Sequence, residues 1–183
     1  MNLLEFRHEK DQFFKSRNSP LKAAYRPAFT GLLYYPENVA MRFICHLEPD
    51  PTRAATVMQT STGSQVVYER LGWVEFTVAE TAARLAVFAP EGELEPQQVF
   101  VPFRDATSGQ TTYSAGRYLE AHLTGNTVQL DFNVAYNPYC AYSDGWSCPI
   151  PPPENWLTVA IEAGEKTLAK LEAVPVQTGG DDD

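Results

Sequence analysis

The chain has 183 residues and a net charge of -9, which argues against nucleic acid or an anionic membrane as a partner because phosphates are bound by clustered Lys and Arg. Its 44% hydrophobic and 20% charged residues form a globular mixture and exclude a chain that is disordered throughout. No window approaches the roughly 18 apolar residues of a membrane span, and the first residues do not resemble a secretory leader, so we expect a soluble, cytoplasmic protein with reduced thiols.

The first segment predicts one amphipathic helix over residues 3–16. Its apolar side chains share about a third of the helical circumference, and they are Leu3, Phe6, Phe13 and Phe14. Asn2 can cap the first turn, and Pro20 prevents the helix from continuing. We expect this helix to be held against the rest of the protein by its aromatic face.

Short strands rich in aromatic and β-branched residues follow, bounded by Pro and Gly. They number about nine and span 31–35, 40–48, two segments of 55–78 around a turn at 61–64, 84–89, 98–103, two arms of a hairpin within 117–134, and 156–161. With few helices between them, they predict an antiparallel β-sandwich or barrel rather than a parallel α/β sheet.

Three further features complete the expected domain. Gly72 interrupts a strand, so we expect a bulge or tight bend there. A short helix is expected over 163–171. Residues 175–183 predict a disordered acidic tail, which leaves 1–174 as a single domain.

Alternation along residues 128–134 puts polar side chains on one face of a strand. If Val128, Leu130 and Phe132 face the core, then Asp131 and Asn133 share the opposite face. Such a face can line a polar cavity, or it can be the solvent side of a two-faced sheet.

The loop between the predicted strands at 98–103 and 117–124 carries two arginines. Arg104 and Arg117 can hold a carboxylate or phosphate in a bidentate manner. Alternatively, Arg104 can pair with Asp105 or Asp131 and merely fix the loop.

Two thiols, Cys140 and Cys148, flank a seven-residue segment ahead of a proline-rich stretch. Zinc sites favour tighter cysteine pairs, so we predict no metal here, and Cys45 and His46 would point to opposite faces of a strand. A disulfide would contribute about 2–3 kcal/mol if it formed. We favour structural thiols beneath a rigid lid, because prolines keep such a segment extended.

Glu120 and His122 share one face of their predicted strand, as either an acid/base pair or an ordinary surface pair. The sequence contains no nucleophile elbow, phosphate loop or dinucleotide fingerprint. No familiar enzyme class is therefore indicated, and no cofactor is predicted.

Several stretches carry a family resemblance, namely "FTGLLYYP", "VFVPFRDATSGQTTYSAGRYL", "LDFNVAYNPYCAYSDGWSCPIPPPENWL" and "IEAGE". Over about residues 10–166 the chain resembles the DUF1684 family of uncharacterised bacterial and archaeal proteins, a resemblance that implies no established activity. The polar, glycine and thiol residues that it marks are Arg104, Asp105, Gly116, Arg117, Asp131, Asn133, Tyr136, Asn137, Cys140, Cys148, Glu154, Asn155 and Glu165.

These residues lead us to expect a pocket for a small anionic molecule under the proline-rich loop. Arg104 and Arg117 would provide charge, and the complete expected site is Arg104, Asp105, Arg117, Asp131, Asn133, Tyr136 and Asn137. Nucleic acid and membrane are not expected as partners, and the oligomeric state stays open.

Three alternatives remain. The first is a hydrolase-like enzyme with Asp131 or Glu154 as general base. The second is thiol redox chemistry at Cys140 and Cys148. The third is a structural or interaction domain without a small-molecule site.

Overall fold

The computed structural model describes residues 2–173, and the predicted tail at 175–183 lies outside them. One α-helix, α1, spans Leu3–Lys15. The strands are β1 (Arg42–Pro49), β2 (Ala55–Gln59), β3 (Gln65–Val78), β4 (Thr81–Pro90), β5 (Gln98–Phe103), β6 (Arg117–Thr124) and β7 (Thr127–Asp131). Five short 3-10 helices are η1 (Ala23–Ala28), η2 (Val39–Met41), η3 (Phe132–Val134), η4 (Tyr139–Ala141) and η5 (Pro153–Asn155).

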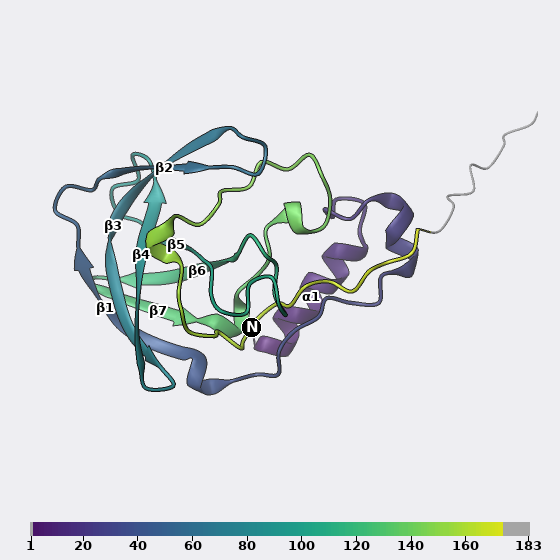
Figure 1. The fold of residues 1–183 in the computed structure, drawn as a ribbon, viewed down its shortest axis with the longest axis horizontal. Coiled ribbons are helices and arrows are strands. Elements are labelled where there is room, and N and C mark those ends of the chain that lie inside the picture. Colours follow the sequence, from purple (N-terminus) through teal and green to yellow (C-terminus); the bar gives the residue numbers. More distant parts are fainter. Residues whose placement is uncertain (1, 174–183) are drawn as a thin grey trace, which may run out of the picture.

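Six strands close into an antiparallel barrel (Figure 1). Neighbours pair in the order β1-β7-β6-β5-β4-β3, and pairing of β1 with β3 completes the ring. β2 extends the sheet from β3 as an additional strand. The predicted mainly β fold with an N-terminal helix is confirmed, and of the two predicted architectures the barrel is the one formed.

Side chains fill the interior of the barrel. Along β4, Leu85 and Val87 belong to the interior cluster, whereas Phe88 belongs to a separate cluster outside the barrel wall. This alternation of inward and outward residues is the one that a closed sheet requires. Phe103 and Phe132 pack edge to face inside the barrel with their ring centroids 5.3 Å apart, and both are fully buried. A binding site has to be sought outside this packed interior.

The predicted count of about nine strands is wrong, because seven form among residues 2–173. The ranges 31–35 and 156–161 are not strands: Tyr34 makes one bridge to Glu165, and Trp156 makes one parallel bridge to Arg104. Each segment runs beside a partner that is itself irregular, so a single bridge does not extend into a ladder.

The predicted helix at 163–171 is also wrong, since this segment has no helical turns. Gly164 adopts a left-handed φ of 75°, and a Cβ there would lie 2.6 Å from the carbonyl oxygen of Phe132. The carbonyls of Ala163 and Glu165 accept hydrogen bonds from the Arg117 side chain instead of from helical amides. Tertiary contacts therefore override the local helix propensity.

The predicted irregularity at Gly72 is confirmed as a register shift in the pairing of β3 with β4. Gly72 has a φ of 154°, and a Cβ there would lie 2.0 Å from the carbonyl oxygen of Glu48. Only glycine lets β1 approach β3 this closely. The bulge thus stands where the barrel closes.

The hairpin of β6 and β7 forms as predicted, but its second arm ends at Asp131 rather than at residue 134. The Asp131 side chain accepts a hydrogen bond from the backbone amide of Asn133 and so caps the 3-10 helix η3. Asp131 and Asn133 consequently do not share the face of one strand, which corrects the pattern expected from alternation.

Helix α1 is confirmed, with a capping box in which Asn2 and Glu5 each bind the other's backbone amide. Phe14 is fully buried, in a second core outside the barrel made with Leu21, Phe29, Leu32 and Tyr142. By contrast, Phe13 is 37% exposed. The helix therefore leaves part of its aromatic face uncovered.

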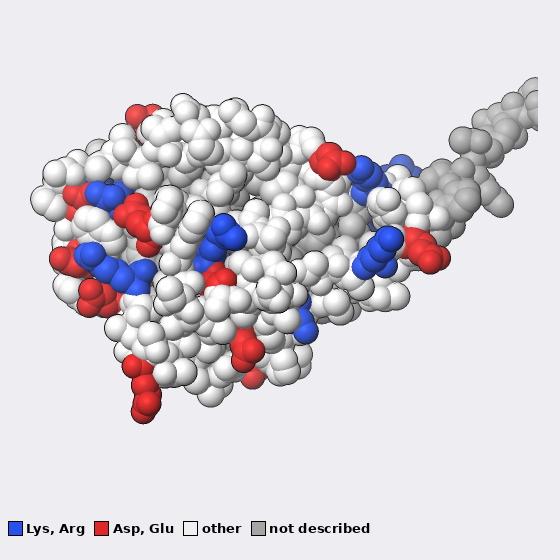
Figure 2. All heavy atoms as spheres, in the orientation of Figure 1, with Lys and Arg blue, Asp and Glu red and all other residues white. Residues whose placement is uncertain are grey.

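No helix among residues 2–173 has the length and apolar character needed to span a bilayer. Figure 2 shows one face of the molecule, on which Lys and Arg lie among Asp and Glu with uncharged surface between them. The basic side chains in this view form no continuous patch.

Candidate functional site

The structure encloses Arg117 completely. Its guanidinium donates to the carbonyl oxygens of Ala163 at 2.5 Å and Ile161 at 2.8 Å, and to Asp105 Oδ1 at 3.4 Å. Burial lowers the pKa of Arg117, and the charge of Asp105 opposes that effect. The arginine binds the C-terminal segment to the barrel and presents no charge to the outside.

Asp105 also binds the C-terminal segment to the barrel. Its Oδ2 accepts hydrogen bonds from the Ile161 amide at 2.7 Å and from Thr107 Oγ1 at 2.8 Å, and its side chain is fully buried. Both carboxylate oxygens are thus used inside the protein. Asp105 pairs with Arg117 and not with Arg104, the arginine considered for it from the sequence.

A second buried network surrounds Glu165, which is fully buried. Its Oε2 accepts from the Asn137 amide at 2.8 Å and from Lys10 Nζ at 2.9 Å, and its Oε1 accepts from the Tyr142 hydroxyl. Burial, followed by the charge of Glu165, raises the pKa of Tyr142 well above its usual value. Glu165 therefore fastens the C-terminal segment both to α1, through Lys10, and to the segment that carries Asn137 and Tyr142.

Asp131 and Asn133 form a third group. Asp131 accepts from Arg42 Nε at 2.9 Å and from Asn133 Nδ2 at 2.8 Å. Asn133 also binds the backbone amide and carbonyl of Asn38, at 2.7 and 2.9 Å. These contacts hold the segment that leads into β1.

The proline-rich stretch packs on the outside of the barrel. Asn155, fully buried, binds Ala86 N at 2.7 Å, Ala86 O at 2.9 Å and Pro102 O at 2.8 Å. It fills the gap between β4 and β5, which pair at a single position. Next to it, the Arg104 guanidinium lies 4.6 Å from the centroid of the Trp156 ring.

Cys140 and Cys148 are free thiols, the first half-buried and the second buried. The hydroxyl of Tyr113 lies 3.9 Å from Cys140 Sγ. Burial raises the pKa of the Cys148 thiol to about 11, so little of it is the reactive thiolate at neutral pH. Among residues 2–173, no group of three or more His, Cys, Asp or Glu is placed to hold a metal ion.

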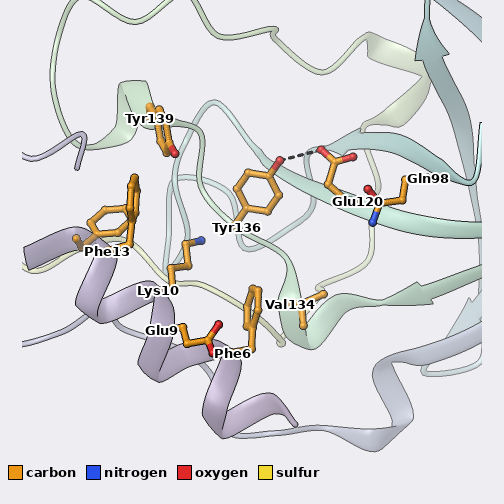
Figure 3. A pocket seen from close by; sticks show the side chains of 10 residues that line it. Phe6, Glu9, Lys10, Phe13, Gln98, Glu120, Val134, Tyr136 and Tyr139 are labelled. Atoms are coloured by element: carbon orange, nitrogen blue, oxygen red, sulfur yellow. Dashed lines mark hydrogen bonds between the residues drawn. The ribbon is translucent and has the colours of Figure 1, made fainter. Parts of the chain in front are cut away.

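The structure therefore does not bring Arg104, Arg117 and Asp131 together at one cavity. Tyr136 lines a cavity of about 690 Å³ between α1 and the barrel, here called the helix groove (Figure 3), whereas Asp131 lines a separate cavity of about 470 Å³ near the start of α1. Helix α1 contributes Phe6, Glu9, Lys10, Phe13 and Phe14. The opposite wall consists of Gln98, Glu120, Val134, Tyr136 and Tyr139.

Tyr136 is positioned by its backbone, which exchanges two hydrogen bonds with Tyr118 at the edge of β6. Its hydroxyl donates to Glu120 Oε1 at 2.9 Å, and the two side chains point toward each other in Figure 3. Glu120 lies on the outer face of β6, because its neighbours Leu119 and Ala121 face the barrel interior.

Burial changes the pKa values of both Glu120 and Tyr136. Burial raises the pKa of the Glu120 carboxyl, and the hydrogen bond from Tyr136 opposes this shift. Burial, aided by the nearby charge of Glu120, raises the pKa of Tyr136 as well. A carboxyl group with a raised pKa at the wall of a cavity is a common mark of a functional site.

A smaller cavity of about 400 Å³, here called the wall cavity, adjoins the helix groove. The two share Gln98, Glu120 and Tyr136 among their lining residues. Tyr68 and Phe100 line the wall cavity and stack with ring centroids 5.1 Å apart. Glu120 and Tyr136 thus stand where the two cavities meet.

The family described as "Protein of unknown function (DUF1684)" matches residues 27–166. The chain belongs to this family. An uncharacterised protein of Haloarcula marismortui, solved by solution NMR, is similar to this DUF1684 protein with 38% identity and a TM-score of 0.72, over 90% of this chain and 92% of that one. The search of curated proteins gives no match.

Sequence reasoning identified Tyr136 as a site residue and Glu120 as a partner of His122, but it did not connect the two. Phe6, Phe13 and Tyr139 were not assigned to a site at all. Phe6 and Phe13 belong to the predicted apolar stripe of α1, and nothing in their spacing indicates that part of this stripe faces a cavity. The DUF1684 match begins at residue 27, so the helix side of the groove lies before it.

Proposed function

We propose that this DUF1684 protein binds a small organic molecule in the helix groove. The observation that carries the proposal is a cavity of about 690 Å³ in which half of the lining residues are aromatic, with the Glu120 carboxylate and the Tyr136 hydroxyl hydrogen-bonded at its wall. This combination of size, apolar lining and sparse polar groups is typical of small-molecule sites. Phe6, Phe13 and Tyr136 would contact the apolar body of the ligand.

The proposal moves the site away from the arginines. An anion at Arg117 would have to displace Asp105 and three backbone carbonyls from a fully buried guanidinium. Leaving those carbonyls without donors costs roughly 1–3 kcal/mol for each group. The helix groove needs no such rearrangement.

A hydrolase with Asp131 or Glu154 as general base has less support from the geometry. Asp131 pairs with Arg42 at 2.9 Å, and Glu154 pairs with Arg70 at 3.3 Å. Each carboxylate is thus occupied by an arginine of this protein, and neither lines the helix groove.

A fragment screen by saturation-transfer NMR tests the proposal. Gln98 is exposed, begins β5 and lines both cavities, so Gln98→Trp should block the groove while suiting a strand. Gln97→Trp makes the same exchange one position earlier, outside the residues that line the two cavities. We expect fragments that bind the wild type and Gln97→Trp to lose binding to Gln98→Trp. Equal binding to all three proteins, or no binding to the wild type, would overturn the proposal.

A further inference from the structure

We infer that the ligand of the helix groove is an organic cation, an ammonium group on a small aromatic body, with Glu120 as its counter-charge. This inference rests on the proposed function and adds the chemical class of the ligand. It depends on the charges that line the two cavities, on the free capacity of Glu120, and on the aromatic rings beside that carboxylate.

The charges that line the cavities are mainly negative. Glu9 lines the helix groove, Glu93 lines the wall cavity, and Glu120 lines both. Lys10 is the one basic side chain among these lining residues, and its ammonium is 2.9 Å from Glu165, which is fully buried behind it. Because Glu165 neutralises Lys10, the three carboxylates leave the cavities acidic.

The Glu120 carboxylate can accept a further hydrogen bond. Its Oε1 accepts from the Tyr136 hydroxyl, whereas no hydrogen bond from residues 2–173 reaches its Oε2, and it has no salt-bridge partner in this part of the chain. Glu120 is exposed as a whole residue, yet burial of its carboxyl is the main cause of its raised pKa, and the hydrogen bond from Tyr136 opposes that shift. An ammonium ion at Oε2 would add a charge-assisted hydrogen bond and place a positive charge beside the carboxylate.

The rings around Glu120 suit a cation as well. Lys10 Nζ already lies 4.8 Å from the centroid of the Tyr136 ring, which shows that this ring accepts a positive charge. Tyr68 and Phe100 stack in the wall cavity next to Glu120. Aromatic faces attract ammonium groups by about 0.5–2 kcal/mol, and more strongly where water is excluded.

Other ligand charges fit less well. An anion in the helix groove would lie beside Glu9 and Glu120 and would be repelled by both carboxylates. A neutral molecule would cover the Glu120 carboxylate without replacing the water that it loses, and burial of an uncompensated charge is unfavourable. The arrangement therefore discriminates in favour of a cation by disfavouring the alternatives.

Three probes that share one aromatic body test the charge: 2-phenylethylamine, 2-phenylethanol and 3-phenylpropionate. We expect the amine to bind the wild type about 10-fold more tightly than the alcohol, as expected for a charge-assisted hydrogen bond. Glu120→Gln keeps an acceptor for Tyr136 and removes the charge, so it should abolish this preference. Glu75→Gln, on the outer face of β3, is the matched control and should retain it. Calorimetric titration measures the affinities, and circular dichroism checks the fold of each variant.

The outcomes separate this inference from the proposed function. Equal binding of amine and alcohol, tighter binding of the carboxylate, or an unchanged preference in Glu120→Gln overturns the cation inference and leaves groove binding intact. A further outcome is that none of the three probes binds while other fragments still bind in the groove. In that case the cation inference is overturned if the fragments that bind include no cations. If no fragment binds in the groove either, both the inference and the proposed function are overturned.

Discussion

At the scale of single residues, the Arg117 side chain donates hydrogen bonds to backbone carbonyls, as the amides of a neighbouring strand do elsewhere in the barrel. It donates to the backbone carbonyls of Ile161, Ala163 and Glu165, which lie in a segment without regular secondary structure. Its charge is balanced by Asp105, whose side chain is equally buried. This arrangement predicts a strong effect on stability.

Replacing Arg117 with Met should lower the free energy of unfolding by about 3–5 kcal/mol, because Asp105 would be left as a buried charge without its partner. Arg84→Met is the control, since Arg84 is 47% exposed and its pair with Glu48 should contribute less than about 1 kcal/mol. Urea denaturation followed by tryptophan fluorescence measures both changes. Equal unfolding midpoints for Arg117→Met and the wild type would contradict the structural role of this arginine.

The residue scale also shows why the site proposed from the structure differs from the one predicted from the sequence. Arg and Asp residues close together in a sequence fit a ligand pocket and a buried hydrogen-bond network equally well. Arg104 and Arg117 were both assigned to an anion site, yet one lies on Trp156 at the surface and the other is fully buried. What separates the two interpretations is burial, which depends on the distant C-terminal segment.

At the scale of elements, the regular strands were predictable because alternation of apolar and polar residues survives in them. The segments 98–103 and 117–124 correspond to β5 and β6 within the described chain. The segments at 31–35 and 156–161 look equally strand-like but pair with irregular chain. Local sequence does not show whether such a segment forms a strand, because that depends on whether the chain beside it is regular.

The junction of β4 and β5 yields a prediction at this scale. These strands pair only at Phe88 and Phe100, and the Asn155 side chain provides three further hydrogen bonds between them and η5. Asn155→Ala should therefore lower the free energy of unfolding by at least about 2 kcal/mol and speed hydrogen exchange of the Ala86 amide.

Asn18→Ala is the control for this change, because Asn18 is exposed and its side chain makes no hydrogen bond within residues 2–173. It should leave both the stability and the exchange rate of Ala86 close to those of the wild type. Unaltered protection of the Ala86 amide in Asn155→Ala would show that the junction does not depend on this side chain.

At the scale of the whole molecule, the barrel acts as a packed support and the candidate site lies on its outside. Helix α1 and β6 face each other across the helix groove although more than one hundred residues separate them in the sequence. Lys10 links the two sides, since its ammonium contacts both Glu165 and the Tyr136 ring. Sequence analysis could identify each wall, but the cavity exists only in the assembled fold.

The measurement that tests this account most directly is chemical-shift mapping of the intact, isotope-labelled protein. The titrants are aromatic fragments that carry positive, neutral and negative charges. We predict saturable shifts at the backbone amides of Phe6, Phe13, Glu120 and Tyr136, largest for the cationic fragments, with little change at Arg104 and Arg117. Saturable shifts centred on the two arginines, or no saturable shift around the helix groove, would contradict the account.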